Sequence, residues 1–227
     1  MSVLTVRHRR HAATFRLAEG QSDAVAVREV WEANDYRLDG SVADGTVVDI
    51  GANVGAFSVL AARLGATTVH AYEPHPDNRA CLERNLAAND VAHRVIVHPE
   101  AVDAGPGKMW LTGEGGGAHA GPAAGPGLAV ETVGLDDILV EEVVLLKVDC
   151  EGAEYDIFDG VDGELLNRVQ RIALEFHGPG MPHLAHLDAD GRHLARWGRM
   201  MAKLANYGQL EIKGRPMVGG LAWWRRY

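Results

Sequence analysis

The sequence contains only two cysteines, Cys81 and Cys150. Small secreted domains that depend on disulfides carry many cysteines, so this chain has no disulfide framework. The chain also lacks an apolar run of about 18 residues, the length that a membrane-spanning helix needs. Its first residues lack the charged, apolar and cleavage regions of a signal peptide. We therefore expect a cytoplasmic protein that does not enter a membrane.

The sequence also has fewer basic residues than acidic residues. The chain has 22 Lys and Arg against 31 Asp and Glu, a net charge of −9 at pH 7 with neutral histidines. An acidic surface repels phosphate backbones, so we expect no nucleic-acid partner. Two short basic clusters, 7–11 and 225–226, lie near the ends of the chain, where residues are commonly solvated. The expected partner is a small molecule, and a homo-oligomer is left open.

What the sequence does have is a regular alternation of strand and helix patterns from residue 46 onward. Strand patterns cover 47–50, 68–72, 95–98, 143–148 and 171–176, and helix patterns cover 56–64, 76–89, 153–166 and 192–206. Such alternation predicts an α/β fold with a mainly parallel, doubly wound sheet. Two last strand patterns, 209–213 and 221–226, predict a hairpin that adds an antiparallel edge strand.

Two segments depart from this alternation. Residues 1–45 are mixed, with one helix pattern at 24–32, and we expect a helical, substrate-facing extension before a domain at 46–227. Residues 104–127 are rich in glycine and contain one strand pattern, 108–112. The rest of that segment predicts a flexible loop. Such a loop is either a surface insertion or a lid over the substrate.

The first strong strand ends in a glycine turn, DIGANVG at 49–55. Gly51 and Gly55 let the backbone turn tightly, and the next helix offers free N–H groups to a carboxylate. A dinucleotide-binding turn has a glycine where Asn53 stands, and Asp49 would repel a pyrophosphate, which disfavours an NAD-dependent oxidoreductase. The methionine half of S-adenosylmethionine, with an ammonium and a carboxylate, fits better. We expect Asp49 to hold that ammonium, directly or through water.

The ends of the next two strands predict the rest of the cofactor site. Glu73, followed by Pro74, ends the second strand 22 residues after Gly51. An acid in that place accepts hydrogen bonds from ribose hydroxyls. After the third strand, Glu100 or the backbone near Ala101 is placed to accept a hydrogen bond from an adenine amine.

Acidic and imidazole side chains follow the fourth and fifth main strands. Neighbouring parallel strands lie about 4.8 Å apart. Asp149 should therefore lie close to Glu175 and His177, next to the methyl group that S-adenosylmethionine would transfer. These three side chains suit general-base catalysis on a hydroxyl. Asp149 and Glu175 also suit a divalent metal such as magnesium. Asp149 alternatively caps the following helix, and Lys147, inside an apolar strand, should pair with a carboxylate.

Four runs of the sequence resemble the FkbM family of methyltransferases: VVDIGANVGAFSVLAARLGA, AYEPHP, LLKVDCEGAEYDIFDG and RIALEFHG. They fall within residues 47–177. The resemblance implies a Rossmann-like class I methyltransferase fold, S-adenosylmethionine as cofactor, and O-methylation of a small molecule such as a sugar or natural-product intermediate. The runs do not cover 1–45 or 104–127, so the acceptor stays open. N-methylation of an amine and a non-catalytic S-adenosylmethionine-binding role are the alternatives.

Overall fold

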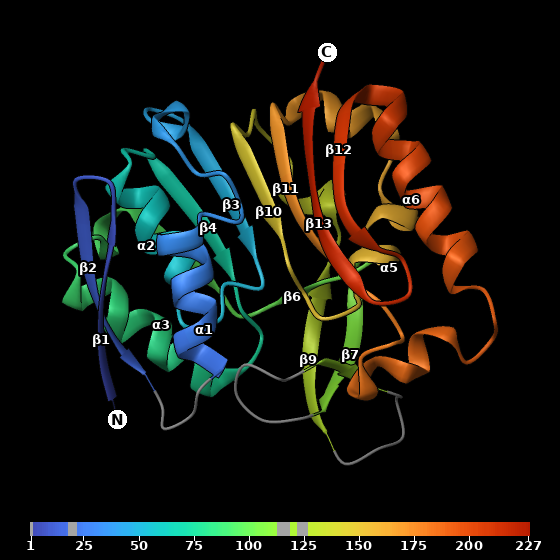
Figure 1. Cartoon of the computed structure of the whole chain (residues 1–227), viewed down its shortest axis with the longest axis horizontal. Helices are drawn as coiled ribbons and strands as arrows, with labels where there is room; N and C mark the ends of the chain where they lie inside the picture. Colours follow the sequence, from blue (N-terminus) through green and yellow to red (C-terminus); the bar gives the residue numbers. More distant parts are fainter. Residues whose placement is uncertain (1, 18–21, 113–118, 122–126) are drawn as a thin grey trace.

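A seven-stranded sheet forms the centre of the fold (Figure 1). The computed structural model describes residues 2–17, 22–112, 119–121 and 127–227. In spatial order the strands are β12 (Gly208–Arg215), β13 (Gly219–Arg226), β11 (Arg171–His177), β10 (Leu145–Val148), β3 (Thr46–Ile50), β4 (Thr68–Tyr72) and β5 (Val95–His98). The strands from β11 to β5 are parallel, and β13 pairs antiparallel with β11 and β12. The predicted fold class is confirmed.

The direction of the chain across this sheet reverses between β3 and β10. From β3 the chain continues to β4 and β5, and it later returns to the other side of β3 to form β10 and β11. Ligands of open α/β sheets bind beyond the carboxyl ends of the strands at such a reversal. The residues that follow Ile50 and Val148 therefore lie where a ligand is expected.

Helices cover both faces of the sheet. They are α1 (Ser22–Arg28), a π-helical turn (Glu29–Ala33), α2 (Ala56–Arg63), α3 (Pro76–Ala88), α4 (Leu135–Ile138), α5 (Glu154–Gly160) and α6 (His193–Tyr207), with short 3₁₀ helices at Gly40–Val42, Ala92–Arg94, Gly163–Arg168 and Pro182–Asp188. Because successive strand residues point to opposite faces, Val47 joins one hydrophobic cluster, with α2 and α3, and Val48 joins another, with α5 and α6. Among the described helices, none has the length and apolar character to cross a bilayer.

The helix predicted for 153–166 is shorter than expected. α5 ends at Gly160, and Asp162 begins a separate 3₁₀ helix, where its carboxylate accepts a hydrogen bond from the backbone N–H of Glu164 at 3.1 Å. Aspartate at such a position favours the start of a new helix over the continuation of the old one.

A second, smaller sheet lies near the bottom of Figure 1. Its order is β6 (Ala101–Val102), β9 (Leu128–Val133), β7 (Gly107–Thr112) and β8 (His119–Gly121). The strand predicted at 108–112 is confirmed. The loop predicted for the rest of 104–127 is wrong at His119–Gly121, which pairs with β7 and gains backbone hydrogen bonds there. Residues 113–118 and 122–126 lie outside the described residues.

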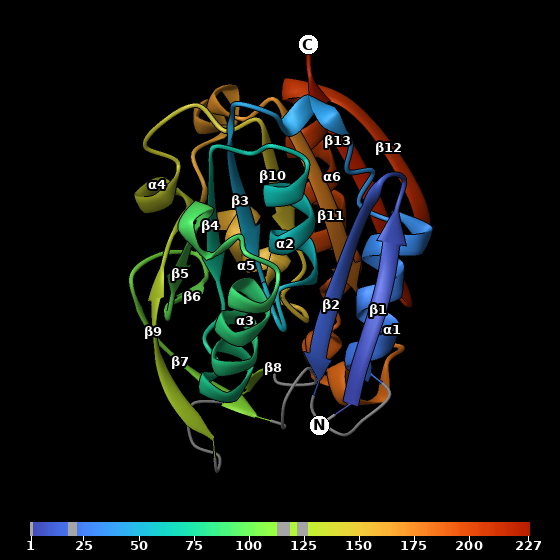
Figure 2. The same cartoon turned by 90° about the vertical axis from the view of Figure 1, so that its left-hand side faces the viewer.

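The N-terminal extension begins with a β-hairpin, which the sequence patterns did not predict. β1 (Ser2–His8) pairs antiparallel with β2 (His11–Leu17), and α1 follows beside it (Figure 2). Phe15 and Leu17 of the hairpin are fully buried in the cluster that α2 and α3 also share. The helix pattern at 24–32 is confirmed as α1 and the π-helical turn.

Two asparagines, Asn85 of α3 and Asn89 at its C-terminal cap, fasten this hairpin to the rest of the fold. The Asn89 side chain accepts a hydrogen bond from the Thr14 N–H at 3.0 Å and donates one to the Thr14 carbonyl at 2.9 Å. The Asn85 side chain accepts from the Arg16 N–H at 2.8 Å and donates to the Val54 carbonyl at 2.9 Å. The side-chain amides of these two asparagines thus bond to the backbone of β2 as a neighbouring strand would.

We predict that Asn85→Ala destabilises the fold through this connection. The substitution leaves the Arg16 N–H and the buried Val54 carbonyl without partners, and two such groups cost about 2–4 kcal/mol in the free energy of unfolding. Urea denaturation measures the loss, with Glu83→Ala, an exposed change on the same helix, as the control. Equal stability of the two variants would contradict the role given to Asn85.

Candidate functional site

The loop between β3 and α2 contains the predicted glycine turn. Gly51, Asn53 and Gly55 have φ values of 75°, 50° and 88°, all in the left-handed region. A Cβ atom at Gly51 would collide with the backbone carbonyl of Asp149, so only glycine allows the ends of β3 and β10 to approach this closely. The Asn53 N–H donates to Glu73 Oε2 at 2.8 Å, and Asn53 Oδ1 is buried without a partner among the described residues.

Glu73 follows β4 directly, and only 5% of it is exposed. Its Oε1 accepts hydrogen bonds from the His75 N–H at 2.8 Å and from Asn78 Nδ2 at 3.2 Å, while Oε2 accepts from Asn53. Burial raises the pKa of Glu73, and these hydrogen bonds oppose the shift. Since a carboxylate offers about four lone-pair sites, Glu73 keeps acceptor capacity for a hydroxyl.

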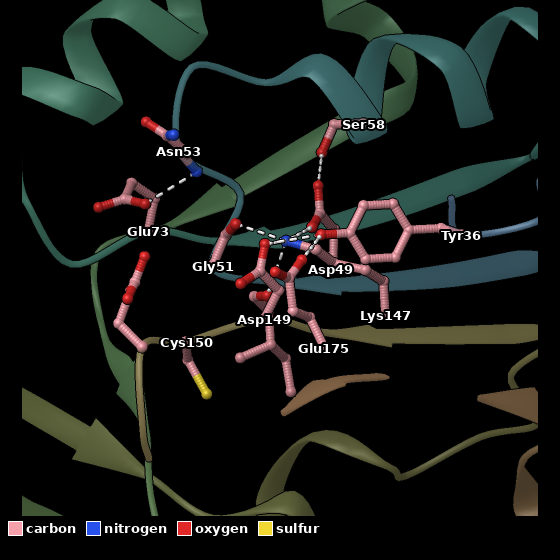
Figure 3. Close-up of polar contacts among 12 residues, drawn as sticks. Tyr36, Asp49, Gly51, Asn53, Ser58, Glu73, Lys147, Asp149, Cys150 and Glu175 are labelled. Atoms are coloured by element: carbon pink, nitrogen blue, oxygen red, sulfur yellow. Dashed lines mark hydrogen bonds and ion pairs between the residues drawn. The ribbon is translucent and has the colours of Figure 1, made fainter. Parts of the chain in front are cut away.

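Lys147 lies at the centre of the site (Figure 3). Its Nζ donates to the carbonyls of Ile50 at 3.1 Å and Gly51 at 2.6 Å. The same ammonium lies 3.3 Å from Asp49 Oδ1 and 3.4 Å from Asp149 Oδ2, so the predicted pairing with carboxylates is confirmed. Burial opposes the charge, but the two aspartates raise the pKa of Lys147 above its usual range. Lys147 is therefore a buried cation.

Asp49 lies behind the glycine turn and is fully buried. Its Oδ2 accepts a hydrogen bond from Ser58 Oγ at 2.6 Å, and its Oδ1 faces Lys147. Asp49 does not line the cavity described below. Its contacts hold Lys147 and α2, and the contact with a ligand ammonium, directly or through water, stays a prediction.

The carboxyl ends of β10 and β11 bring Asp149, Glu175 and His177 together, as the strand spacing predicts. One nitrogen or oxygen atom from each lies within 4.8 Å of the other two. His177 Nε2 lies 3.8 Å from Asp149 Oδ1, 3.9 Å from Glu175 Oε1 and 3.7 Å from Glu151 Oε2. On the other side of the ring, Nδ1 is hydrogen-bonded to Glu154 Oε1 at 2.7 Å. We call Asp149, Glu151, Glu175 and His177 the carboxylate cluster.

The charges of this cluster shift the pKa values of its members. Burial alone would lower the pKa of His177, but the charge and hydrogen bond of Glu154 raise it to about 10. Burial and the charge of Asp149 raise the pKa of Glu175 to about 7. Burial opposes the ionisation of Asp149, but Lys147 and His177 lower its pKa. A pKa of about 10 favours the protonated form of the His177 imidazole at neutral pH.

Tyr36 belongs to the site, although no sequence pattern selected it. Its hydroxyl oxygen lies 2.8 Å from both Asp149 Oδ2 and Glu175 Oε2. A single hydroxyl proton cannot be given fully to both carboxylates. Of the two carboxylates, Glu175 is the one that takes up a further proton more readily, because its pKa is raised. The Tyr36 ring packs edge-on against Phe57, with centroids 5.6 Å apart.

A cavity of about 430 Å³ joins the glycine turn, the carboxylate cluster and the N-terminal extension. Gly51 and Asn53 form one side of its lining, and Glu29 of the extension contributes to another. The other predicted cofactor residues do not line this cavity. Gly55 belongs to the glycine turn, Glu73 lies beside it, Pro74 and Glu100 line a separate hollow of about 340 Å³, and Ala101 is buried in β6.

Comparison with known proteins places this site in a family. Residues 49–209 match the model described as the methyltransferase FkbM domain. The 31-O-demethyl-FK506 methyltransferase FkbM of Streptomyces tacrolimicus is 29% identical over 168 residues, which cover 58% of this chain and 65% of that protein. Methyltransferase sdnD of Sordaria araneosa is 27% identical over 191 residues, which cover 67% of this chain and 74% of that protein. The chain thus spans somewhat less than two thirds of the Streptomyces relative.

Solved structures show the same fold. The crystal structure of methyltransferase FkbM from Methylobacillus flagellatus KT has a TM-score of 0.52 at 17% identity, covering 92% of this chain and 56% of that one. A putative rRNA-methylase from Clostridium thermocellum, 9% identical with a TM-score of 0.51, covers 93% of this chain and all of that one (100%). The family match contains the glycine turn, Glu73 and the carboxylate cluster, and it excludes Tyr36. The chain belongs to the FkbM methyltransferase family.

Proposed function

We propose that this chain transfers the methyl group of S-adenosylmethionine to a hydroxyl of a small molecule, such as a natural-product intermediate or a sugar. The observation that carries the proposal is one cavity in which the glycine turn faces the carboxylate cluster. S-adenosylmethionine supplies a methyl group already activated by its sulfonium. The protein then has to align the acceptor, which contributes about 7–11 kcal/mol, and to remove its proton.

The residues around the glycine turn fit the cofactor. The first turn of α2 has no side-chain cap, so its N–H groups can receive a carboxylate. The unpartnered Asn53 Oδ1 can accept a hydrogen bond from an ammonium group, and buried polar atoms of this kind usually have a partner. Glu73 has acceptor capacity for the ribose. We place the adenine near Pro74 and Glu100, beside the backbone of Ala101.

The carboxylate cluster would accept the proton of the acceptor hydroxyl. Asp149 is kept ionised by Lys147, and 26% of its side chain is exposed. Glu175 is linked to Asp149 through Tyr36, so a proton received by one carboxylate can be shared with the other. A positioned base of this kind contributes about 10²–10⁴-fold in rate. His177, as a cation, would stabilise the negative charge that develops on the oxygen.

The charge of the cavity supports a small acceptor over a nucleic acid. Glu29, Asp149, Glu151 and Glu175 line it, and these carboxylates repel phosphates. The Streptomyces relative is named for a small-molecule substrate, which supports the same class. The contribution of α1 to the lining supports a substrate-facing role for residues 1–45. Cys81 and Cys150 are free thiols, which supports a cytoplasmic location.

We predict that Glu73→Ala weakens the binding of S-adenosylmethionine and S-adenosylhomocysteine. The loss of a charge-assisted hydrogen bond costs about 1.5–3 kcal/mol, which corresponds to about 10- to 100-fold in Kd. Calorimetric titration measures both ligands, with NADH as the control ligand and Glu83→Ala as the control variant. No binding of either ligand to folded wild type would refute the cofactor assignment, and binding of NADH would point to an oxidoreductase.

We also predict that Asp149→Asn lowers kcat by about 10²–10⁴-fold, because the acceptor proton loses its base. The affinity for S-adenosylmethionine should change little, since Asn has the same shape. Transfer of a labelled methyl group to a panel of alcohols, including 31-O-demethyl-FK506, and to matched amines measures the effect. Asp136→Asn, the same change at an exposed aspartate, is the control. Wild-type turnover in Asp149→Asn, or transfer to amines alone, would argue against the proposal.

A further inference from the structure

The His177 imidazole is held with one nitrogen aimed into the carboxylate cluster. Only 4% of the residue is exposed, and Glu154 fixes the ring through Nδ1 at 2.7 Å. Nε2 then faces three carboxylate oxygens at 3.7–3.9 Å, which is too long for hydrogen bonds. His177 lines the cavity, and its Nε2 thus points at carboxylate oxygens that lie beyond hydrogen-bond distance. A carboxylate behind a histidine is the usual arrangement around a metal-binding imidazole.

Tyr36 orients the two carboxylates toward the same point. Its hydroxyl holds Oδ2 of Asp149 and Oε2 of Glu175, and it leaves Oδ1 and Oε1 facing His177 Nε2. Each of the three side chains is therefore fixed through one atom and presents the other atom to a common space. From these contacts we infer that Asp149, Glu175 and His177 form a binding site for a divalent metal ion.

The spacing of the three atoms agrees with a shared ion. Ligands about 2.1 Å from an octahedral metal lie about 3.0 Å apart when adjacent and about 4.2 Å apart when opposite. The distances of 3.8 and 3.9 Å from Nε2 to the two oxygens fall between these values. One ligand atom from each of the three residues lies within 4.8 Å of the other two.

The local charge also favours a cation. Carboxylates of Asp149, Glu151, Glu154 and Glu175 surround the space, and Lys147 already pairs with Asp49 as well. Crowded carboxylates in a partly buried site need compensating positive charge. A divalent ion bound by the three side chains would supply that charge, and histidine binds such an ion as the neutral imidazole.

One imidazole with two carboxylates is a mixed donor set. Carboxylates suit Mg²⁺ and Mn²⁺, and imidazole suits later first-row metals, so Mn²⁺ matches the set better than Mg²⁺ does. At this position the ion would bind the acceptor oxygen and lower the pKa of its hydroxyl. That role in acceptor activation rests on the proposed function, whereas the binding of the ion does not.

The test measures the binding of Mn²⁺ to the protein. The electron paramagnetic resonance signal of free aqueous Mn²⁺ decreases as protein is added and binds the ion. We expect binding by wild type and by His93→Gln, a change at an exposed histidine. We expect none by His177→Gln. Tyr36→Phe and Glu154→Gln, which keep the three ligands, should weaken binding by about 10- to 100-fold. Circular dichroism confirms that each variant is folded.

Titration of the same samples with S-adenosylmethionine separates the two proposals. Mn²⁺ binding that His177→Gln abolishes supports the metal site, even when S-adenosylmethionine does not bind and the proposed function fails. If wild type binds S-adenosylmethionine and leaves Mn²⁺ free, the metal site is overturned and the proposed function stands. Equal Mn²⁺ binding by wild type and a folded His177→Gln variant would also overturn it.

Discussion

The buried ammonium of Lys147 is the interaction on which the site depends. In the parallel pairing of β10 with β3, Lys147 lies opposite Asp49, so the register itself brings the charges together. The same ammonium holds the carbonyls of Ile50 and Gly51, where β3 ends, and the carboxylate of Asp149. Removing one partner of a buried ion pair costs about 3–5 kcal/mol. Lys147 therefore joins the glycine turn to the carboxylate cluster as one unit.

This arrangement explains how so many carboxylates can lie close together. Asp149 is compensated by Lys147, and Glu175 accepts a hydrogen bond from the Tyr36 hydroxyl. Glu154, fully buried, accepts hydrogen bonds from the backbone N–H groups of Cys150 and Gly152 as well as holding His177. Asp149, Glu154 and Glu175 therefore each have a fixed partner before any ligand arrives. Such preorganisation lowers the cost of reorganising the site during a reaction.

Sequence patterns sufficed for the parts of the fold that local chemistry determines. Apolar runs between helices predicted the parallel strands, and glycine at Gly51 predicted the turn, because no other residue fits there. The spacing of neighbouring parallel strands correctly predicted that Asp149 and Glu175 lie close together. The hairpin of β1 and β2 was missed because its turn, at Arg9 and Arg10, has none of the usual turn residues. β8 was missed because its stability comes from pairing with β7 and not from its own composition.

Tyr36 could not be predicted for a different reason. It reaches Asp149 and Glu175 across 113 and 139 residues of sequence, and nothing in its neighbours marks that contact. It also lies outside residues 49–209, the segment that matches the family. The shared segment therefore supplies the carboxylates of the cluster, while the extension contacts two of them through Tyr36 and lines the cavity through Glu29. Under the proposed function, relatives with the same motifs but other extensions would differ in the acceptor that they admit.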